Sequence, residues 1–135
     1  MANEAVIIEL PRNINPVMMT IADSGTIEKG TLLKTSDPNT AAASSARDEW
    51  GGIAAAEKVT LDGSTKLAVY KAGCFDLTCA ATLAAAITIG ECVTLSGANL
   101  IDAATEAEIQ LGKFIGWAEE AGGNGEVIRV RLRGN

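Results

Sequence analysis

The segment IEKGTLL at residues 27–33 returns in similar form as ITIGECV at residues 87–93. In both copies an isoleucine stands three residues before a glycine, Gly30 or Gly90, and a short β-prone run follows. The two glycines lie 60 residues apart. A pattern that returns in this way indicates a structural unit that is present twice.

A second pair of similar segments supports this duplication. Gly-Ile-Ala at residues 52–54 is matched by Gly-Trp-Ala at residues 116–118, which lies 64 residues further along the chain. We therefore expect a single β domain at residues 13–135, composed of pseudo-repeats at about 13–72 and 73–134.

Each copy ends in a run that alternates between apolar and other side chains, which is the pattern of a half-buried strand. The first run is KLAVYK at residues 66–71, and the second is EVIRVRLR at residues 126–133. Short runs separated by turn residues are typical of β proteins. The sequence predicts an all-β fold, a small barrel-like or sandwich domain built from two similar halves, with at most short helical turns.

Two segments are harder to assign from the sequence. Residues 40–46 are small and weakly patterned, so we expect a mobile surface loop, with a short helix at 43–49 as the alternative. Asp62-Gly63 predicts a hairpin turn that joins strands at 59–61 and 67–70.

One short helix is compatible with the sequence near residues 103–110. Thr105 and Glu108 have the spacing of a capping box, in which each side chain satisfies a backbone N–H of the first helical turn. This pattern favours one or two helical turns.

Residues 1–12 have no counterpart in the second half and are interpreted as an extended N-terminal arm. Their centre, AVIIEL at residues 5–10, is β-prone and is closed by Pro11. Such an arm can add to the edge of another sheet, where main-chain hydrogen bonds supply affinity. The alternative is an ordinary first strand of the same domain. The candidate partner-binding residues of the arm are Val6, Ile7, Ile8 and Leu10.

The formal net charge of −6 argues against nucleic-acid binding, because recognition of phosphates needs a concentrated basic face. No run of about 18 apolar residues occurs, so no membrane partner is expected. The first residues lack the basic and apolar regions of a signal peptide, and we expect the chain to stay in the cytoplasm during synthesis.

The residue types needed for catalysis are scarce. The chain has no histidine, which removes the commonest general base near neutral pH. Three cysteines are too few for a closed zinc site. We expect Cys79 and Cys92 to be small core residues, and Cys74 to begin a strand. No catalytic residue, metal or cofactor is therefore expected.

The clearest charge pattern is the arginine row of the last run. Arg129, Arg131 and Arg133 alternate with apolar residues and so lie on one face of a strand. They face water, or they pair with carboxylates of a neighbouring strand, subunit or partner, because guanidinium groups suit bidentate contacts with carboxylates. Trp117 is a second candidate for an interface, where tryptophan is enriched.

The spaced glycines and alternating strands together resemble the capsid cement, or head decoration, proteins of tailed bacteriophages. The resemblance covers roughly residues 13–133. The segments that carry it are residues 30–33, 52–54, 71–73, 90–93, 116–118 and 127–132.

This resemblance implies a structural protein and not an enzyme. It implies a β-barrel-like domain that binds the outer surface of the virion across junctions between subunits of the major capsid protein, as a homotrimer. Residues 1–12 would then reach onto the capsid lattice. The alternatives are another minor structural component of a virion, or a small β-barrel module that binds a peptide or a sugar.

Overall fold

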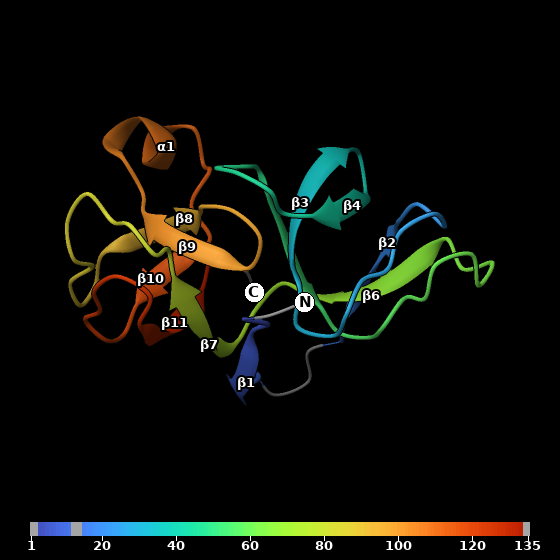
Figure 1. The fold of residues 1–135 in the computed structure, drawn as a ribbon, viewed down its shortest axis with the longest axis horizontal. Coiled ribbons are helices and arrows are strands. Elements are labelled where there is room, and N and C mark those ends of the chain that lie inside the picture. Colours follow the sequence, from blue (N-terminus) through green and yellow to red (C-terminus); the bar gives the residue numbers. More distant parts are fainter. Residues whose placement is uncertain (1–2, 12–14, 134–135) are drawn as a thin grey trace.

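The fold is that of a computed structural model, which describes residues 3–11 and 15–133 (Figure 1). Within these residues there are eleven strands and one short helix, so the predicted all-β class is confirmed. The strands are β1 (Val6–Glu9), β2 (Val17–Thr20), β3 (Leu32–Asp37), β4 (Thr40–Ala43), β5 (Trp50–Ala54), β6 (Lys66–Tyr70), β7 (Cys74–Cys79), β8 (Cys92–Leu95), β9 (Leu100–Ala103), β10 (Gly116–Ala118) and β11 (Val127–Leu132). The helix, α1, is Glu106–Gln110.

The two halves have the same strand pairings. In the first half β2, β4, β3, β5 and β6 form a closed barrel, in which the β2–β4 pair is parallel and the others are antiparallel. In the second half β7, β9, β8, β10 and β11 pair in the corresponding order, and the β7–β9 pair is again the parallel one. The two similar halves predicted from the sequence are therefore present, and they lie next to each other (Figure 1).

Equivalent backbone hydrogen bonds in the two halves are separated by the same number of residues as the repeated sequence segments. The N–H of Gly30 donates to the carbonyl of Ala54 at 2.8 Å, and the N–H of Gly90 donates to the carbonyl of Ala118 at 2.7 Å. The donors lie 60 residues apart and the acceptors 64. The repeated glycines thus mark equivalent backbone positions of the two halves.

A four-residue turn also recurs, at residues 28–31, 59–62, 88–91 and 123–126. In each turn the N–H of the fourth residue donates to the carbonyl of the first, at 3.1 or 3.2 Å. The third residue has a positive φ, which glycine adopts at little cost and other residues adopt with strain. The four third residues are Gly30, Leu61, Gly90 and Gly125.

The two halves are joined by apolar packing. Neighbouring residues of a strand point to opposite faces, so Leu33 packs inside the first barrel while Leu32 packs with the core of the second half. Ile53 and Ala54 divide in the same way, with Ile53 directed to the second half. Buried Phe75 of β7 belongs to this shared core, and Tyr70 packs against it. The two halves therefore meet through a continuous apolar core.

Polar contacts also bridge the halves. Arg47, in the loop before β5, donates to Asp102 Oδ2 at 3.0 Å, to Glu108 Oε1 at 2.7 Å and to the carbonyl of Ala103 at 2.9 Å. The N–H of Leu32 donates to Oδ1 of the buried Asn99 at 2.9 Å. Together these contacts fix the orientation of one half relative to the other.

Helix α1 begins as the sequence predicts. Thr105 is its N-cap, and the capping box with Glu108 is complete. Glu108 also accepts from Arg47, so the same carboxylate caps the helix and connects it to the first half.

Three expectations for individual segments are wrong. Residues 40–43, expected in a loop, form β4, because Ala41 and its neighbours pair with β3 and close the barrel, whereas residues 44–46 lie outside the strand and no helix forms at 43–49. Residues 59–61 form one of the repeated turns, so Asp62-Gly63 does not join two paired strands. Cys92 is only half-buried on the outer side of β8, whereas Cys79 is fully buried as expected.

The Arg47 ion pairs make the protein sensitive to acid. The hydrogen bond from Arg47 lowers the pKa of Glu108 from 4.5 to about 2. Because this pKa is lowered by folding, its contribution to stability is complete above pH 4.5 and is lost as the pH falls toward 2. Asp62 behaves in the same way. Its pKa is lowered from 3.8 to about 2, mainly by a hydrogen bond from Lys58, so its contribution to stability is lost as the pH falls from 3.8 to about 2.

Replacing Arg47 by methionine should lower the free energy of unfolding at pH 7 by about 2 kcal/mol, because three hydrogen bonds to the carboxylates of Asp102 and Glu108 and one to the carbonyl of Ala103 are lost. It should also flatten the loss of stability below pH 4.5, which urea unfolding at several pH values measures. Lys34→Met is the control, since Lys34 reaches Asp48 only at 3.9 Å on the surface and should change stability by less than about 0.5 kcal/mol. Equal effects of the two substitutions would contradict this role of Arg47.

Candidate interaction surface

The N-terminal segment is a strand of the molecule's own sheet. β1 pairs antiparallel with β7, so that Val6 lies opposite Asp76, Ile7 opposite Phe75 and Glu9 opposite Cys74. Of the two interpretations that the sequence left open, the described structure has the ordinary first strand. Residue 12, at the end of the expected arm, lies outside the described residues, as do residues 1–2.

β1 is nevertheless exposed and has an unpaired edge. Among the described strands it is the one with a single partner, since every other strand pairs on two sides. Val6 is 58% exposed, and Ile7 and Ile8 are each 38% exposed. Leu10 is half-buried and packs against the shared core. Three of the four predicted arm residues are thus available to a partner, and the fourth anchors the segment.

Two glycines make room for this segment. A Cβ at Gly30 would lie 2.7 Å from the carbonyl oxygen of Ala5, and a Cβ at Gly73 would lie 2.8 Å from that of Glu9. The carbonyl of Gly30 in turn accepts from the N–H of Ala5 at 2.8 Å. The N-terminal segment therefore sits across both halves, against the first at Gly30 and against the second at β7.

The arginine row lies on the outer face of the second half. Along β11 exposed and buried residues alternate, with Arg129 and Arg131 exposed and Ile128 and Val130 buried, as the sequence predicts. Arg129 lies opposite Asp76, which lies opposite Val6 on its other side. The structure thus brings the exposed valine of β1 and the arginine row onto one face.

Trp117 joins this face from β10. It lies opposite Arg131 on one side and Cys92 on the other. The Arg131 guanidinium lies 5.6 Å from the centre of the Trp117 ring, within the range of a cation–π contact. Arg133 is placed differently, 4.6 Å from the centre of the Phe114 ring, with a hydrogen bond to the carbonyl of Gly112 at 3.0 Å.

A shallow depression of about 410 Å³ opens beside Trp117 and Arg131. We call it the dish. Its lining residues are Ile89, Gly90, Trp117, Ala118, Glu119 and Arg131. Ile89 is 73% exposed and stands where the first copy of the repeat has Lys29, a difference that is visible in the sequence. Sequence reasoning found Trp117 and Arg131 but missed Ile89.

Next to the dish, Cys74 contacts Glu119 with its Sγ 3.6 Å from Oε1. Burial raises the pKa of the Cys74 thiol, and the nearby charge of Glu119 raises it further. Cys74 therefore stays a neutral thiol near neutral pH and is a poor nucleophile.

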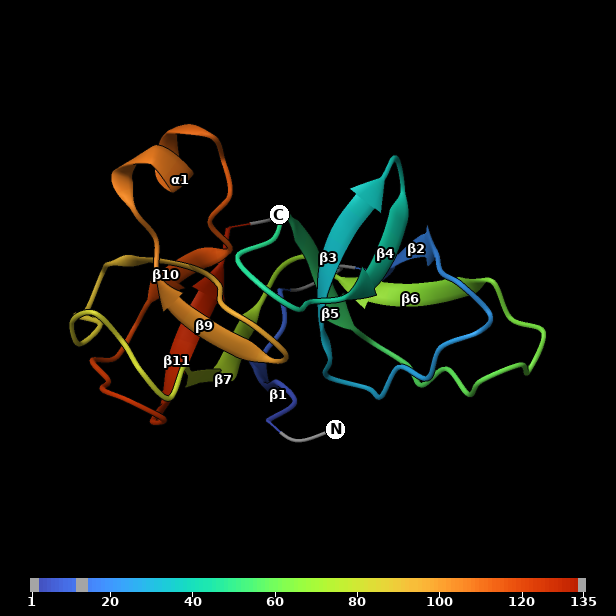
Figure 2. The ribbon, with the colours of Figure 1, turned by 45° about the horizontal axis from the view of Figure 1, so that its top comes forward.

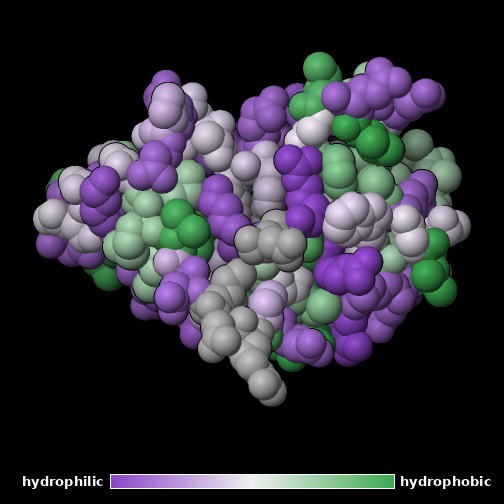
Figure 3. Space-filling model, turned by 180° about the vertical axis from the view of Figure 1, so that it is seen from behind, coloured by the Kyte–Doolittle hydropathy of each residue, from purple (hydrophilic) through white to green (hydrophobic). Residues whose placement is uncertain are grey.

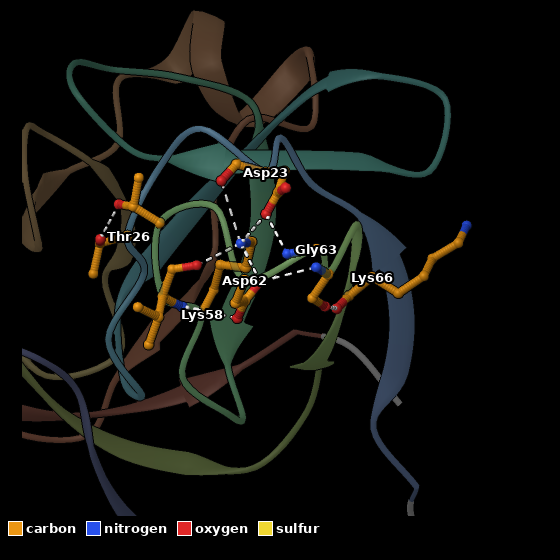
Figure 4. A network of polar contacts seen from close by, with 9 residues as sticks. Asp23, Thr26, Lys58, Asp62, Gly63 and Lys66 are labelled. Carbon is orange, nitrogen blue, oxygen red and sulfur yellow. Dashed lines mark hydrogen bonds and ion pairs between the residues drawn. The ribbon is translucent and has the colours of Figure 1, made fainter.

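A compact ion network connects the turn at 59–62 with Asp23 in the first half (Figure 4). Nζ of Lys58, whose side chain is only 1% exposed, lies 2.6 Å from Asp23 Oδ1 and 2.5 Å from Asp62 Oδ1. It also donates to the carbonyl of Val59 at 2.6 Å. Burial works against the charged lysine, but the hydrogen bonds to Asp23 and Asp62 outweigh it and raise the pKa. The lysine is thus a structural cation and not a nucleophile.

Sequence reasoning missed this network. The signal that could have revealed it is the comparison of the two halves, since Lys58 occupies the position of Gly122 in the second. A lysine at a position where the other half has glycine indicates that the side chain has a role specific to the first half.

The described residues contain no group of three or more side chains suited to hold a metal ion. Nor does this part of the chain have a helix long and apolar enough to cross a membrane. Exposed apolar residues form small separate patches among polar ones on the face seen in Figure 3.

Comparison with known proteins finds similarity in structure but not in sequence. No protein-family model matches the chain, and no curated protein sequence matches it. A solved structure does: the N base of the head fibre gp8.5 of bacteriophage phi29. The TM-score is 0.53 over 88% of this chain and 92% of that one, at 12% sequence identity. The two proteins share a fold.

The close contact between the N-terminal segment and Gly30 can be tested with a pair of substitutions. Gly30 and Gly90 occupy equivalent turns with φ of 91° and 86°, but a Cβ at Gly90 would meet nothing within 4 Å. Both alanine variants should lose about 1 kcal/mol of stability from backbone strain. Gly30→Ala should in addition displace the N-terminal segment and speed amide exchange of β1, as measured by hydrogen–deuterium exchange. Equal rates of amide exchange of β1 in the Gly30→Ala and Gly90→Ala variants would contradict this contact at Gly30.

Proposed function

We propose that this protein is a structural component of a phage virion that decorates and stabilises the outer surface of the capsid. The fold shared with the base of a phage head fibre is the observation that carries this proposal. The resemblance of its spaced glycines and strands to head decoration proteins supports it independently.

The capsid contact is assigned to β1. Val6, Ile7 and Ile8 present apolar side chains on a strand whose outer edge is unpaired. Such a strand can bind by main-chain hydrogen bonds, with its side chains providing specificity. An extended segment of the major capsid protein is the partner proposed for it.

The neighbouring face adds a second contact. Val6, Arg129, Arg131 and Trp117 lie on the same side of the sheet, and arginine and tryptophan are the residues most enriched in binding hot spots. No ion pair described for residues 3–11 and 15–133 involves Arg129, Arg131 or Arg133. Carboxylates of a capsid subunit or of a second copy would complete this face. Its charge and shape suit a contact that bridges two subunits.

A homotrimer is the proposed assembly. Three copies placed around a three-fold junction of the lattice multiply contacts that are individually weak, because each bound copy raises the effective concentration of the next. The junctions of the shell would then be held together against outward pressure. The protein would be made in the host cytoplasm and end on the exterior of the virion, where its net charge of −6 faces away from packaged DNA.

The titratable groups support a non-catalytic role without a cofactor. The largest pKa shifts belong to Arg47, Glu108 and Asp62, and each is explained by an ion pair that holds loops or halves together. None of these groups lines the dish. Partners proposed for the protein are therefore other protein surfaces.

A minor structural component elsewhere on the virion is the remaining candidate. The match to a head fibre base favours it to the same extent, since that protein is itself an appendage of a phage head. Copy number in purified particles separates the two, because a decoration protein occupies hundreds of sites and a minor component few.

Substitutions on β1 test the proposed contact. Val6→Asp combined with Ile8→Asp should weaken binding to purified empty capsids about tenfold or more, because both residues are exposed and apolar. Co-sedimentation with the capsids measures the change. Deleting residues 2–11 should abolish binding, but it also uncovers β7, so the point substitutions are the sharper test.

The matched control lies on the first half. Val17 and Met18 are 44% and 52% exposed on β2, and Val17→Asp with Met18→Asp should leave capsid binding unchanged. Thermal melting checks that each variant is folded. Unchanged binding by a folded β1 variant would remove β1 from the proposed mechanism.

A further inference from the structure

Leu61 has a backbone conformation that its side chain disfavours. Its φ is +57°, and the other described non-glycine residues with positive φ are asparagines. Asparagine tolerates this region, whereas a bulky residue there is an outlier. The three equivalent turns of the molecule have glycine at this position.

The same leucine is 75% exposed to solvent. Burial therefore does not compensate for its strained backbone. Strained residues persist when their surroundings hold them, and they concentrate at functional sites. An exposed, strained leucine where glycine would fit without strain points to a contact that the isolated chain does not contain.

The turn that presents Leu61 is held rigidly. Lys58 binds the carbonyl of Val59 and the carboxylates of Asp23 and Asp62, on both sides of the turn (Figure 4). The N–H of Leu61 donates to the carbonyl of Asp23 at 2.8 Å. A rigid turn loses little entropy on binding, which favours its use as a contact.

Val59 extends the apolar surface of this turn, since it is 59% exposed. We call Val59 and Leu61 together the knob. Its surroundings are acidic: Glu57 is exposed, and the carboxylates of Asp23 and Asp62 keep 33% and 34% of their side chains exposed around one enclosed lysine. A partner for the knob should offer an apolar surface next to a positive charge.

The dish on the second half has these properties. It combines the exposed Ile89 and the Trp117 ring with the Arg131 guanidinium, and the carboxylate of Glu119, which also lines it, contacts the Cys74 thiol at 3.6 Å. The knob and the dish belong to different halves, and the loop that carries the knob lies at the end of the molecule away from the second half (Figures 1 and 2). One copy cannot join its own knob to its own dish.

We propose that the knob of one copy docks into the dish of the next copy. This contact joins two different surfaces and is therefore heterologous, and repetition of a heterologous contact closes a ring when the rotation allows it. A homotrimer with three-fold symmetry requires a heterologous contact of this kind. The inference rests on the proposed trimer and assigns its subunit contact.

Self-association of the purified full-length protein tests the contact. Sedimentation velocity over a range of concentrations should show association of the wild type that Leu61→Asn weakens at least about tenfold, because asparagine keeps the turn and removes the apolar side chain. Trp117→Ala should weaken association as much, and the double variant should be no worse than either single one. Leu111→Asn, at a leucine that is 74% exposed outside both surfaces, should leave association unchanged.

A stability measurement separates docking from folding. Leu61→Gly should raise the melting temperature of the dilute protein by about 2–4 °C, because it relieves backbone strain, and should lower association as Leu61→Asn does. A more stable protein that associates less supports the inference, since a merely structural leucine would not behave in this way.

Three results overturn the inference. They are a wild type that stays monomeric up to about millimolar concentration, a Leu61→Asn variant that associates normally, and additive effects of Leu61→Asn and Trp117→Ala. A Leu61→Asn variant that associates normally but no longer binds capsids would place the knob on the shell instead. Failure of the wild type to bind capsids would count against the proposed function and leave the association result to decide the subunit contact.

Discussion

The parallel pairing that closes each half governs the rest of the structure. β2 pairs with β4 and β7 pairs with β9, so every strand from β2 to β11 is paired on both sides in a closed ring of strands. Unpaired strand edges invite pairing with other chains, and closure removes them. β9 covers only the end of β7 at Thr78 and Cys79, which leaves the beginning of β7 for β1. Among the described strands, β1 is the one left with an open edge, and the closure of the second ring determines where it can pair.

The duplication explains the fold, and the differences between the copies explain the surface. Lys58 replaces Gly122, Leu61 replaces Gly125, and Ile89 replaces Lys29, all at positions where the backbone of the two halves is equivalent. Leu61 and Ile89 change the surface, the enclosed Lys58 adds an ion network, and the strand pairings are the same in both halves. Because the halves have diverged in this way, opposite ends of the molecule carry different chemistry. In the proposed docking of the knob into the dish, these two ends would be the surfaces that meet in a head-to-tail contact.

The sequence predicts the strands well wherever alternation or the duplication is clear. β11 and the capping box of α1 follow from local pattern alone. β4 escapes prediction because alanine has little preference for a strand, and its partner β3 determines the outcome. The turn at 59–62 is not evident from the sequence, because Leu61 stands at the position where the other three turns have glycine. Lys58 could not be placed, since its charge predicts exposure unless two carboxylates surround it.

The site was predictable in its residue types but not in its arrangement. Arg131 and Trp117 were found from composition and alternation, yet their stacking depends on the register of β10 against β11, which sequence does not specify. That β1 lies beside the arginine row depends in the same way on β7, which pairs with both strands. The shared core and the Arg47 contacts then hold the two halves as one body. Under the proposed function, this rigidity fixes the distance between contacts at the two ends of the molecule, so that one bound contact raises the effective concentration of the other.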